Sequence, residues 1–411
     1  MLSRIVLAVV VMVLSPRVVL ADVVQEWNVT MLLTLSGQTP FASARYAAIT
    51  QLAVFEAVNA ITRDYRPYIG GVAAPSWASV DAAAASAAHS VLKAYFPAKA
   101  AALDAALTAS LDGVTAGDAK SAGIAAGQAA AAAILALRAN DGSVPPESYL
   151  PPSDSPGQWQ LTPSCPATGG VLRHWGRVAP FGLRSSDQFR LDPPPVVGSA
   201  KYAKDYAEVK AAGGVDSIVR TQDLADVARV FALLSPVTWS NSAARQLSAA
   251  QGQSVAENAR AFALLNMALS DATVAAFDSK YHYDFWRPET AIRAGDADGN
   301  AKTDGDESFA PFIVTPCFPG YPSNHASVSY AAREVLERLY GRDGHDITLT
   351  TASVPGVTLH YTNLEAITDD VDDARVYGGI HFRFDQEAGG RQGRGVGTYV
   401  YQHNLRPAQH D

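Results

Sequence analysis

The chain has 411 residues, more than the roughly 250–300 at which a single hydrophobic core stops growing, so we expect one large or two fused domains. Hydrophobic residues make up 48% of the chain and charged residues only 18%, which excludes an intrinsically disordered protein. The net charge of −8 at pH 7 argues against a nucleic-acid-binding protein, which would normally carry a basic face.

The first residues have the pattern of an export signal. Arg4 precedes an apolar run from Ile5 to Leu14, and Ala21 offers a small residue at the cleavage position. An apolar run of about ten residues is too short to act as an uncleaved anchor across ~30 Å of hydrocarbon. We therefore predict a signal peptide at residues 1–21, a secreted or periplasmic protein, and no membrane span after cleavage.

A first helical bundle is predicted over residues 22–140. Apolar and polar residues recur with a period of 3.6 over residues 40–63, which indicates a helix. Three alanine-rich stretches with spaced Leu, Ile and Val indicate further helices that pack closely. These stretches cover residues 79–94, 98–111 and 117–139.

Residues 141–199 differ in character from the helices on either side. Repeated prolines between Pro145 and Pro195 argue against a sustained helix. Interleaved aromatic residues, among them Trp159 and Trp175, argue against a floppy linker. We predict an ordered irregular segment that packs on the helices.

A second helical bundle is predicted over residues 200–411. Its helices are expected at residues 200–212, 222–234, 243–278, 323–340, 363–377 and 384–403. Two short alternating runs within residues 346–361 give a weak hairpin signal around Pro355-Gly356. No alternation of strands and helices and no glycine-rich dinucleotide motif occurs, so the predicted fold class is all-α, with at most a small hairpin.

Two features allow more than one interpretation. Cys165 and Cys317 are too few for a disulfide scaffold. Export would allow them to form one disulfide, and two unpaired buried cysteines are the alternative. Residues 296–307 place side-chain oxygens at the spacing of a calcium loop, but Ala301 stands where such loops carry glycine. A solvated acidic loop is the preferred interpretation there.

Three short clusters in the last third of the chain carry the candidate site. Lys280 and Arg287 lie seven residues apart, a spacing that places both on one side of a single helix. Ser323, in the sequence Pro322-Ser323-Asn324-His325, is a good N-cap for the helix that follows. The free N–H groups of such a helix start favour an anion.

The third cluster contains Arg375 and, six residues later, His381. Asp385 lies at i+4 from His381, so on one helix face its carboxylate would approach the imidazole ring. Together the clusters supply three cations, a hydroxyl, helix-start amides and two imidazoles. That set predicts a binding site for a small oxyanion, with one imidazole to attack or coordinate and another to move protons.

In order and spacing, the clusters resemble the signature of the superfamily of vanadium-dependent haloperoxidases and type 2 phosphatidic acid phosphatases, which reads K-x6-RP, PSGH and SR-x5-H-x3-D. Lys280 to Pro288 fits the first part without change. Asn324 replaces the glycine of the second part, and Ala374 replaces the serine of the third. Segments such as Trp175–Val178 and Tyr377–Phe384 are similar to bacterial haloperoxidases, so the resemblance extends over the mature chain.

The resemblance implies an oxyanion cofactor, vanadate, and the residues that bind it. Lys280, Arg287 and Arg375 would neutralise its oxygens, and Lys280 would also polarise the peroxide substrate. The Ser323 hydroxyl and the Asn324 backbone N–H would donate hydrogen bonds to the oxyanion. Asparagine keeps the N–H that glycine provides but adds a side chain. Phosphate could occupy the same site, because the two anions have the same shape.

The resemblance also implies the reacting groups. His381 would be the axial ligand of the vanadium in vanadate, or the nucleophile toward a phosphoryl group. His325 would be the acid–base group. Phe318 matches an aromatic residue that lies near the halide site in haloperoxidases. The implied fold is two fused helical bundles, the first mainly of residues 22–140 and the second holding the site.

The function implied first is that of a vanadate-dependent haloperoxidase, which oxidises a halide with hydrogen peroxide to a hypohalous equivalent, with an organic acceptor as a further partner. A secreted soluble acid phosphatase that forms a phosphohistidine at His381 is the alternative. A third interpretation is a non-enzymatic oxyanion-binding protein, against which the intact Lys280, His325 and His381 argue.

Overall fold

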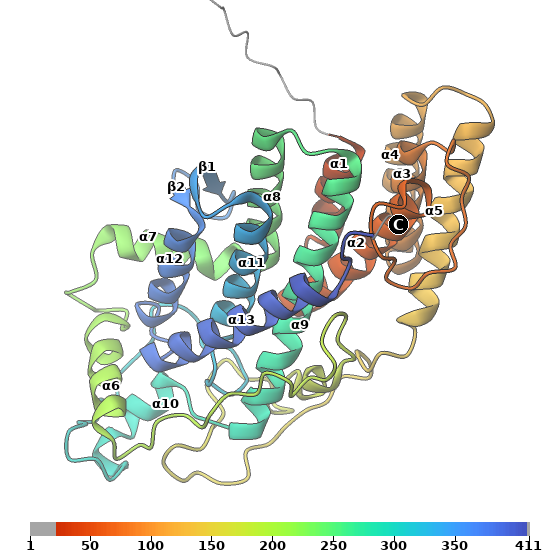
Figure 1. Ribbon diagram of the computed structural model, residues 1–411. Helices are drawn as coiled ribbons and strands as arrows, with labels where there is room; N and C mark the ends of the chain where they lie inside the picture. Colours follow the sequence, from red (N-terminus) through yellow and green to blue (C-terminus); the bar gives the residue numbers. More distant parts are fainter. Residues whose placement is uncertain (1–21, 409–411) are drawn as a thin grey trace, which may run out of the picture.

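The structure, a computed structural model, describes residues 22–408. The signal peptide predicted at residues 1–21 lies outside the described residues. Within residues 22–408 the chain forms thirteen α-helices, three short 3-10 helices and one two-stranded antiparallel sheet, which confirms the predicted all-α fold (Figure 1). The α-helices are α1 (Val23–Leu35), α2 (Pro40–Thr62), α3 (Val80–Tyr95), α4 (Ala100–Asp112), α5 (Asp118–Leu137), α6 (Ala200–Ala212), α7 (Gln222–Leu233), α8 (Pro236–Gln251), α9 (Val255–Tyr283), α10 (Pro288–Arg293), α11 (Asn324–Tyr340), α12 (Leu364–Val376) and α13 (Arg383–His403). The 3-10 helices are η1 (Pro97–Lys99), η2 (Arg173–Arg177) and η3 (Gly295–Ala297).

The N-terminal helices pack together on one side of the molecule, where α3, α4 and α5 stand side by side in Figure 1. The four helices predicted in this region correspond to α2 to α5. Helix α2 is buried along most of its length, between α3 and α5 on one side and α9 on the other. Small side chains allow this packing, since the alanines of α3 are almost all fully buried.

Helix α1 is absent from the sequence prediction, and its buried polar residues explain why. Gln25 and Asn28 lie on the buried face of the helix. Gln25 donates to the Ser248 hydroxyl at 2.8 Å, and Asn28 donates to the Asn241 side-chain oxygen at 2.7 Å. Polar residues at core positions obscure the apolar period of 3.6 on which the prediction depends.

Helix α9 is the central element of the fold. It packs against α2 on one side and against α11 and α13 on the other. One buried hydrophobic cluster runs through these helices, from Val23 near the start of the described chain to Leu405 near its end. The two predicted bundles therefore share a continuous core, while the boundaries predicted for them stay a prediction.

The prediction of a single helix over residues 243–278 is wrong, because two helices occupy this region. Helix α8 ends at Gly252, which adopts the left-handed conformation with φ of 65°. Ser254 then caps α9: its hydroxyl accepts the N–H of Glu257, whose carboxylate accepts the N–H of Ser254. Glycine after a helix and this Ser-x-x-Glu capping box are both local stop and start signals.

Two helices in the described part of the chain, α5 and α9, are long and apolar enough to cross a membrane by length and composition alone. The apolar window of α9 is 94% buried inside the protein, which is the environment of a core helix. That of α5 is 33% buried and owes its apolar character mainly to alanine.

Residues 141–199 form the predicted irregular segment, which runs along the lower side of the molecule in Figure 1 from α5 to α6. Trp159 is fully buried and Trp175 nearly so, which confirms that the segment packs on the helices. A disulfide joins Cys165 in this segment to Cys317, so the disulfide is the correct one of the two alternatives for the cysteines.

The predicted hairpin consists of β1 (Asp343–Thr350) and β2 (Thr358–Asn363), which pair antiparallel. Ile347 lies opposite Tyr361, and both side chains are buried. The hairpin packs against α8 and α12, away from the candidate site.

Helices α11 and α13 pack backbone to backbone through glycines of α13. A Cβ atom at Gly389 would lie 2.6 Å from the Ser323 carbonyl oxygen, and one at Gly397 would lie 2.7 Å from the Ala331 carbonyl oxygen. Gly393 lies between them on the same face, at the four-residue spacing of a helix. The missing side chains let the first turn of α11 approach α13 closely, and that first turn belongs to the candidate site.

Candidate active site

Lys280 and Arg287 enter the site from different elements, so the prediction that both lie on one helix is wrong. Lys280 is in the last turn of α9, which ends where Asp284 adopts φ of 49°. Gln158 donates to the Asp284 carbonyl at 3.1 Å, and the Tyr149 hydroxyl donates to its carboxylate at 2.5 Å. This turn brings Arg287, the N-cap of α10, back beside Lys280, and both side chains are fully buried.

Backbone carbonyls of residues 315–320, called the carbonyl loop below, hold the two cations. Lys280 Nζ donates to two of these carbonyls at 2.8 Å, and Arg287 Nε donates to a third at 3.0 Å. The three acceptors belong to Phe318, Pro319 and Gly320. The Phe318 ring also lies over the cations, its centroid 5.2 Å from Lys280 Nζ and 5.0 Å from Arg287 Cζ.

The start of α11 contains the second cluster. Ser323 is the N-cap, as predicted: its hydroxyl oxygen accepts the N–H of Ala326 at 3.3 Å, while its own N–H donates to the Asp385 carbonyl at 3.0 Å. Asn324 is the first helical residue, so its place in the motif does not require glycine. Its side-chain oxygen is buried and has no hydrogen-bond partner among the described residues.

His381 makes the predicted contact with Asp385, but the two residues do not share a helix face. The histidine lies in the turn before α13 rather than on the helix. Asp385 is in the first turn of α13, where its carboxylate accepts the N–H of Phe382 at 3.1 Å. The same carboxylate oxygen lies 2.8 Å from His381 Nδ1.

The partners of His381 define its tautomer. Arg287 Nη1 lies 2.8 Å from His381 Nε2, and a guanidinium can only donate. Nε2 therefore accepts, and the ring proton is on Nδ1, from which it is donated to Asp385. The lone pair of Nε2 is the group with which an imidazole attacks or ligates.

Arg375 completes the cation cluster from the last turn of α12. Its Nη1 donates to the Phe231 carbonyl at 3.3 Å. Within the described residues, Arg375 Nε and Arg287 Nη2 are buried without an acceptor. Buried donors without acceptors are rare, and here they belong to two cations of one cluster. The arrangement can therefore donate to the oxygens of an anion at no cost in existing hydrogen bonds.

These residues meet at a cavity of about 350 Å³. Its polar part is formed by Asn324, His325, Arg375 and His381. Its apolar part is formed by Pro40, Phe41, Ala232, Leu233, Ile313, Val314, Pro316 and Phe318. The cavity thus brings the second and third predicted clusters together. Arg287 of the first cluster does not line the cavity but contacts His381, which does.

Burial controls the charge states of the three cations. It lowers the pKa of Arg287 to about 10 and that of Arg375 to about 9. Burial also lowers the pKa of Lys280 well below its usual range, and the positive charge of Arg287 lowers it further. A cluster of like charges with so little solvent favours binding of an anion.

The same burial keeps both imidazoles neutral. It lowers the pKa of His325 well below the ordinary value, and the positive charge of Arg375 adds to this effect. For His381, burial and then the charge of Arg287 lower the pKa well below the ordinary value. Burial raises the pKa of Asp385 to about 7, against the opposing effect of the nearby cations.

The acidic loop at residues 296–307 forms hydrogen bonds within itself. The carboxylate of Asp298 is buried and accepts from the Thr303 hydroxyl at 2.8 and 2.9 Å and from the Asn300 N–H at 2.7 Å. No group of three or more His, Cys, Asp or Glu side chains within residues 22–408 is placed to hold a metal ion. The loop is thus more ordered than the solvated loop that was predicted, because the buried carboxylate of Asp298 is used in hydrogen bonds within the loop.

Several residues that shape the site are missing from the sequence prediction. The carbonyl loop acts through backbone oxygens, which carry no residue-type signal. Phe41 and Leu233 come from helices far from the clusters in the sequence. The glycines of α13 do carry a signal, the four-residue spacing of Gly389, Gly393 and Gly397.

Comparisons with known proteins show what the chain is similar to. Residues 260–410 match the family model described as the VCPO second helical-bundle domain. The vanadium chloroperoxidase of Curvularia inaequalis is 26% identical over 179 residues, which cover 32% of this chain but only 29% of that relative. The structure of the first bacterial vanadium-dependent iodoperoxidase superposes with a TM-score of 0.77 at 24% identity, covering 95% of this chain and 97% of that one. A holo-type bacterial vanadium-dependent chloroperoxidase superposes with a TM-score of 0.74 at 19% identity, covering 90% of this chain and 93% of that one.

The fold is therefore that of the bacterial vanadium haloperoxidases over nearly the whole chain. The family that the three clusters resemble, that of the vanadium haloperoxidases, is also the one to which the matching domain model and the curated relative belong. All three clusters lie within residues 260–410, the part of the chain that matches the second helical-bundle domain.

Proposed function

We propose that the protein is a vanadate-dependent haloperoxidase, which oxidises a halide with hydrogen peroxide to a hypohalous equivalent. The observation that carries the proposal is the buried cluster of Lys280, Arg287 and Arg375 around the neutral imidazole of His381. Full-length likeness to solved structures of an iodoperoxidase and a chloroperoxidase supports this choice of activity.

The residues present fit vanadate. Arg287 Nη2 and Arg375 Nε are buried donors without acceptors, and the start of α11 adds the Ser323 hydroxyl and the Asn324 N–H. His381 would hold the vanadium through Nε2, for which Arg287 Nη1 has to exchange its present acceptor. When bound, vanadate supplies a Lewis acid that activates hydrogen peroxide without a change in oxidation state.

The remaining residues position and move protons. Asp385 holds the proton of His381 on Nδ1 and so keeps Nε2 available. His325 lines the cavity and is neutral near pH 7, so it can take a proton from hydrogen peroxide. Lys280, fixed by two carbonyls, keeps one N–H for a substrate oxygen. The apolar wall with Phe318 suits a weakly hydrated halide or an organic acceptor.

A secreted acid phosphatase is the second candidate, and the lone pair on His381 Nε2 is the observation that favours it. The same atom that would hold vanadate is suited to attack a phosphoryl group. His325 would then protonate the leaving oxygen.

One experiment separates the two functions. Metal-free protein is assayed with hydrogen peroxide plus iodide, bromide or chloride, and separately with an aryl phosphate, each with and without orthovanadate. We expect halide oxidation that depends on orthovanadate. If orthovanadate only inhibits release of phosphate and no halide is oxidised, the haloperoxidase proposal is wrong and the phosphatase is correct.

We also propose that the protein acts outside the cytoplasm, in the periplasm or the medium. Support comes from the export pattern of residues 1–21 and from the Cys165–Cys317 disulfide, which suits an oxidising compartment. Expression of the full chain in a bacterial host tests this: the exported protein should begin at or near Asp22 by N-terminal sequencing. An intact N-terminus on cytoplasmic protein would contradict it.

A further inference from the structure

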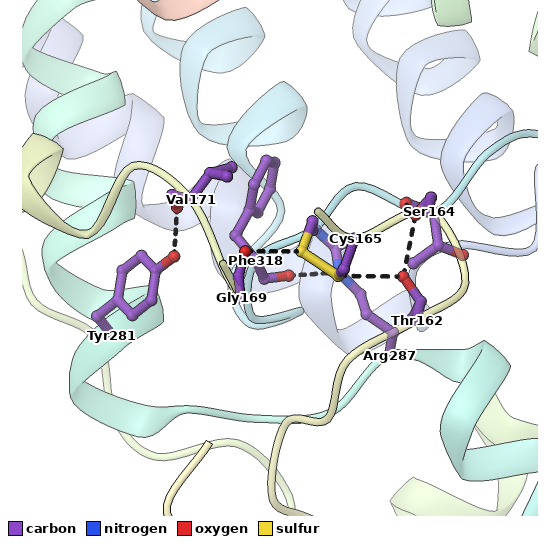
Figure 2. The surroundings of a disulfide bond; sticks show 10 residues. Thr162, Ser164, Cys165, Gly169, Val171, Tyr281, Arg287 and Phe318 are labelled. Carbon is purple, nitrogen blue, oxygen red and sulfur yellow. Dashed lines mark hydrogen bonds between the residues drawn. A yellow bond between two sulfur atoms is a disulfide. The ribbon is translucent and has the colours of Figure 1, made fainter. Parts of the chain in front are cut away.

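The disulfide is directly connected to the elements that hold the site's cations. Cys317 immediately precedes Phe318 in the carbonyl loop, and Cys165 belongs to the irregular segment (Figure 2). Figure 2 draws the disulfide together with Phe318 and Arg287, whose Nε donates to the Phe318 carbonyl oxygen at 3.0 Å. The covalent bond therefore ends one residue from the first of the three carbonyls that accept from Arg287 and Lys280.

The same irregular segment supplies the neighbouring anchors of the loop. The Ser164 hydroxyl donates to the Thr315 carbonyl at 2.6 Å, and the Val171 N–H donates to the Cys317 carbonyl at 3.0 Å. At the other end of the loop, the Gly320 N–H donates to a carbonyl of the turn after α9 at 2.7 Å. The disulfide is thus the covalent member of a set of contacts that fix the loop from outside.

The segment on the Cys165 side is open to solvent. Pro163, Ser164 and Pro166 are exposed, and Cys165 itself is half-buried, whereas Cys317 is buried. Water can compete for the hydrogen bond of Ser164, but it cannot displace a covalent bond. Of the two cysteines, Cys165 is therefore the more accessible from solvent.

The carbonyl loop matters because Lys280 and Arg287 have few other partners. Both of the hydrogen bonds formed by Lys280 go to this loop. Arg287 makes one bond to the loop, one to the Ile380 carbonyl and one to His381. A displaced loop would therefore shift the direction of the remaining N–H of Lys280 and of the Arg287 guanidinium, and with them the donors for an anion.

We propose that the Cys165–Cys317 disulfide is a positioning device for the oxyanion site, and that its reduction weakens anion binding. The inference rests on the proposed oxyanion site. Reduction adds two electrons and two protons, breaks the S–S bond and leaves two thiols. The carbonyl loop is then held by hydrogen bonds alone, and the cations lose their fixed orientation.

The test compares binding of inorganic phosphate to the oxidised and the reduced protein by isothermal titration calorimetry. Phosphate is the probe because reductants also reduce vanadate. The protein is reduced with a water-soluble phosphine, which becomes the phosphine oxide, and is desalted without air before titration. We expect roughly tenfold weaker binding after reduction, less than the roughly 100-fold that a misplacement of about 1 Å can cost in catalytic rate. Reoxidation should restore the affinity.

Two variants and a second measurement separate positioning from general stability. Cys165→Ser with Cys317→Ser should reproduce the reduced state. Ser164→Ala removes the hydrogen bonds of this hydroxyl to the Thr315 carbonyl and to Thr162 but keeps the covalent bond, so it should bind phosphate almost normally. All titrations are made at a temperature where near-UV circular dichroism shows the native fold. Hydrogen exchange should accelerate at the amides of Cys317, Phe318 and Gly320 and not in α9 or α11.

The outcomes are distinct. Equal phosphate affinity in oxidised and reduced folded protein overturns the inference and leaves the proposed function intact. An oxidised protein that binds neither phosphate nor orthovanadate contradicts the proposed function and the inference together. If the double variant fails to fold, the comparison of oxidised and reduced wild-type protein still decides.

Discussion

At the scale of single residues, the neutral imidazole of His381 is the group on which the site depends. Its Nδ1 proton is donated to Asp385, and its Nε2 accepts from Arg287. Because Asp385 is fully buried and interacts with the charges of Lys280 and Arg287, it balances charge as well as orienting the ring. Removing the Asp385 carboxylate should therefore weaken binding of the anion more than it lowers the stability of the fold.

Asp385→Ala is expected to weaken vanadate binding by roughly 10- to 100-fold, the usual effect of losing a carboxylate that orients a ligating histidine. Binding is measured by titrating the metal-free variant with orthovanadate and following halide oxidation. His381→Ala serves as the reference for complete loss. A variant that binds vanadate as tightly as the wild type would show that Asp385 does not orient His381.

His325 gives a prediction about stability and pH. Its pKa in the folded protein lies well below the value of about 6.5 of an unfolded chain. As pH falls, the unfolded state therefore takes up the proton first, so the contribution of the neutral imidazole is present above about pH 6.5 and is lost below it. One such proton changes the free energy of unfolding by up to about 1.4 kcal/mol per pH unit.

Wild-type protein should consequently lose more stability than His325→Gln between about pH 7.5 and pH 5.5. Urea denaturation at both pH values measures the difference. His403→Gln is the matched control, since that side chain is exposed and should leave the wild-type profile unchanged. Parallel profiles for wild type and His325→Gln would contradict the assignment.

At the scale of elements, the contact of α11 with α13 places the start of α11. Gly389→Ala puts a Cβ atom 2.6 Å from the Ser323 carbonyl, so the helices have to separate. We expect a loss of about 1–3 kcal/mol in the free energy of unfolding, as for other overpacked contacts. Phosphate binding should weaken as well, because Ser323 is the N-cap at the site.

Chemical denaturation and phosphate titration check this prediction. Gly198→Ala is the matched control, because a Cβ atom there meets nothing within 4 Å and the backbone needs no positive φ. If Gly389→Ala is as stable as Gly198→Ala, the helices can separate freely and the close contact has no energetic role.

Most elements could be predicted because their signals are local. Proline and glycine positions, helix caps and the 3.6-residue period placed α2 to α7 and α11 to α13 within a few residues. The failures have local causes too. Buried polar residues hid α1, Gly252 and the capping box of Ser254 separate α8 from α9, and the left-handed Asp284 ends the helix between Lys280 and Arg287.

The site was predictable to the extent that it depends on residue types at short spacing. Each cluster is compact in sequence, so Ser323, His381 and their neighbours could be named in advance. The carbonyls that hold Lys280 could not, since any residue supplies one. The cavity walls from α2 and α7 depend on tertiary packing between segments far apart in the chain.

At the scale of the whole molecule, the continuous core along α9 predicts one cooperative unfolding transition. Differential scanning calorimetry should show a single peak, with equal calorimetric and van't Hoff enthalpies. Added phosphate should move the whole peak to higher temperature, because it binds the folded state only. Two peaks, of which phosphate moves one, would show that the bundles unfold independently.

The place of α9 also has a consequence for the order in which the protein acquires its structure during synthesis. Helices α1 to α5 leave the ribosome well before α9, which covers one side of α2. The early chain therefore presents an apolar face that has no partner until most of the polypeptide has been made. A chain bound for export would benefit from this delay, because an N-terminal half that cannot close its core stays extended enough to be kept in a translocation-competent state.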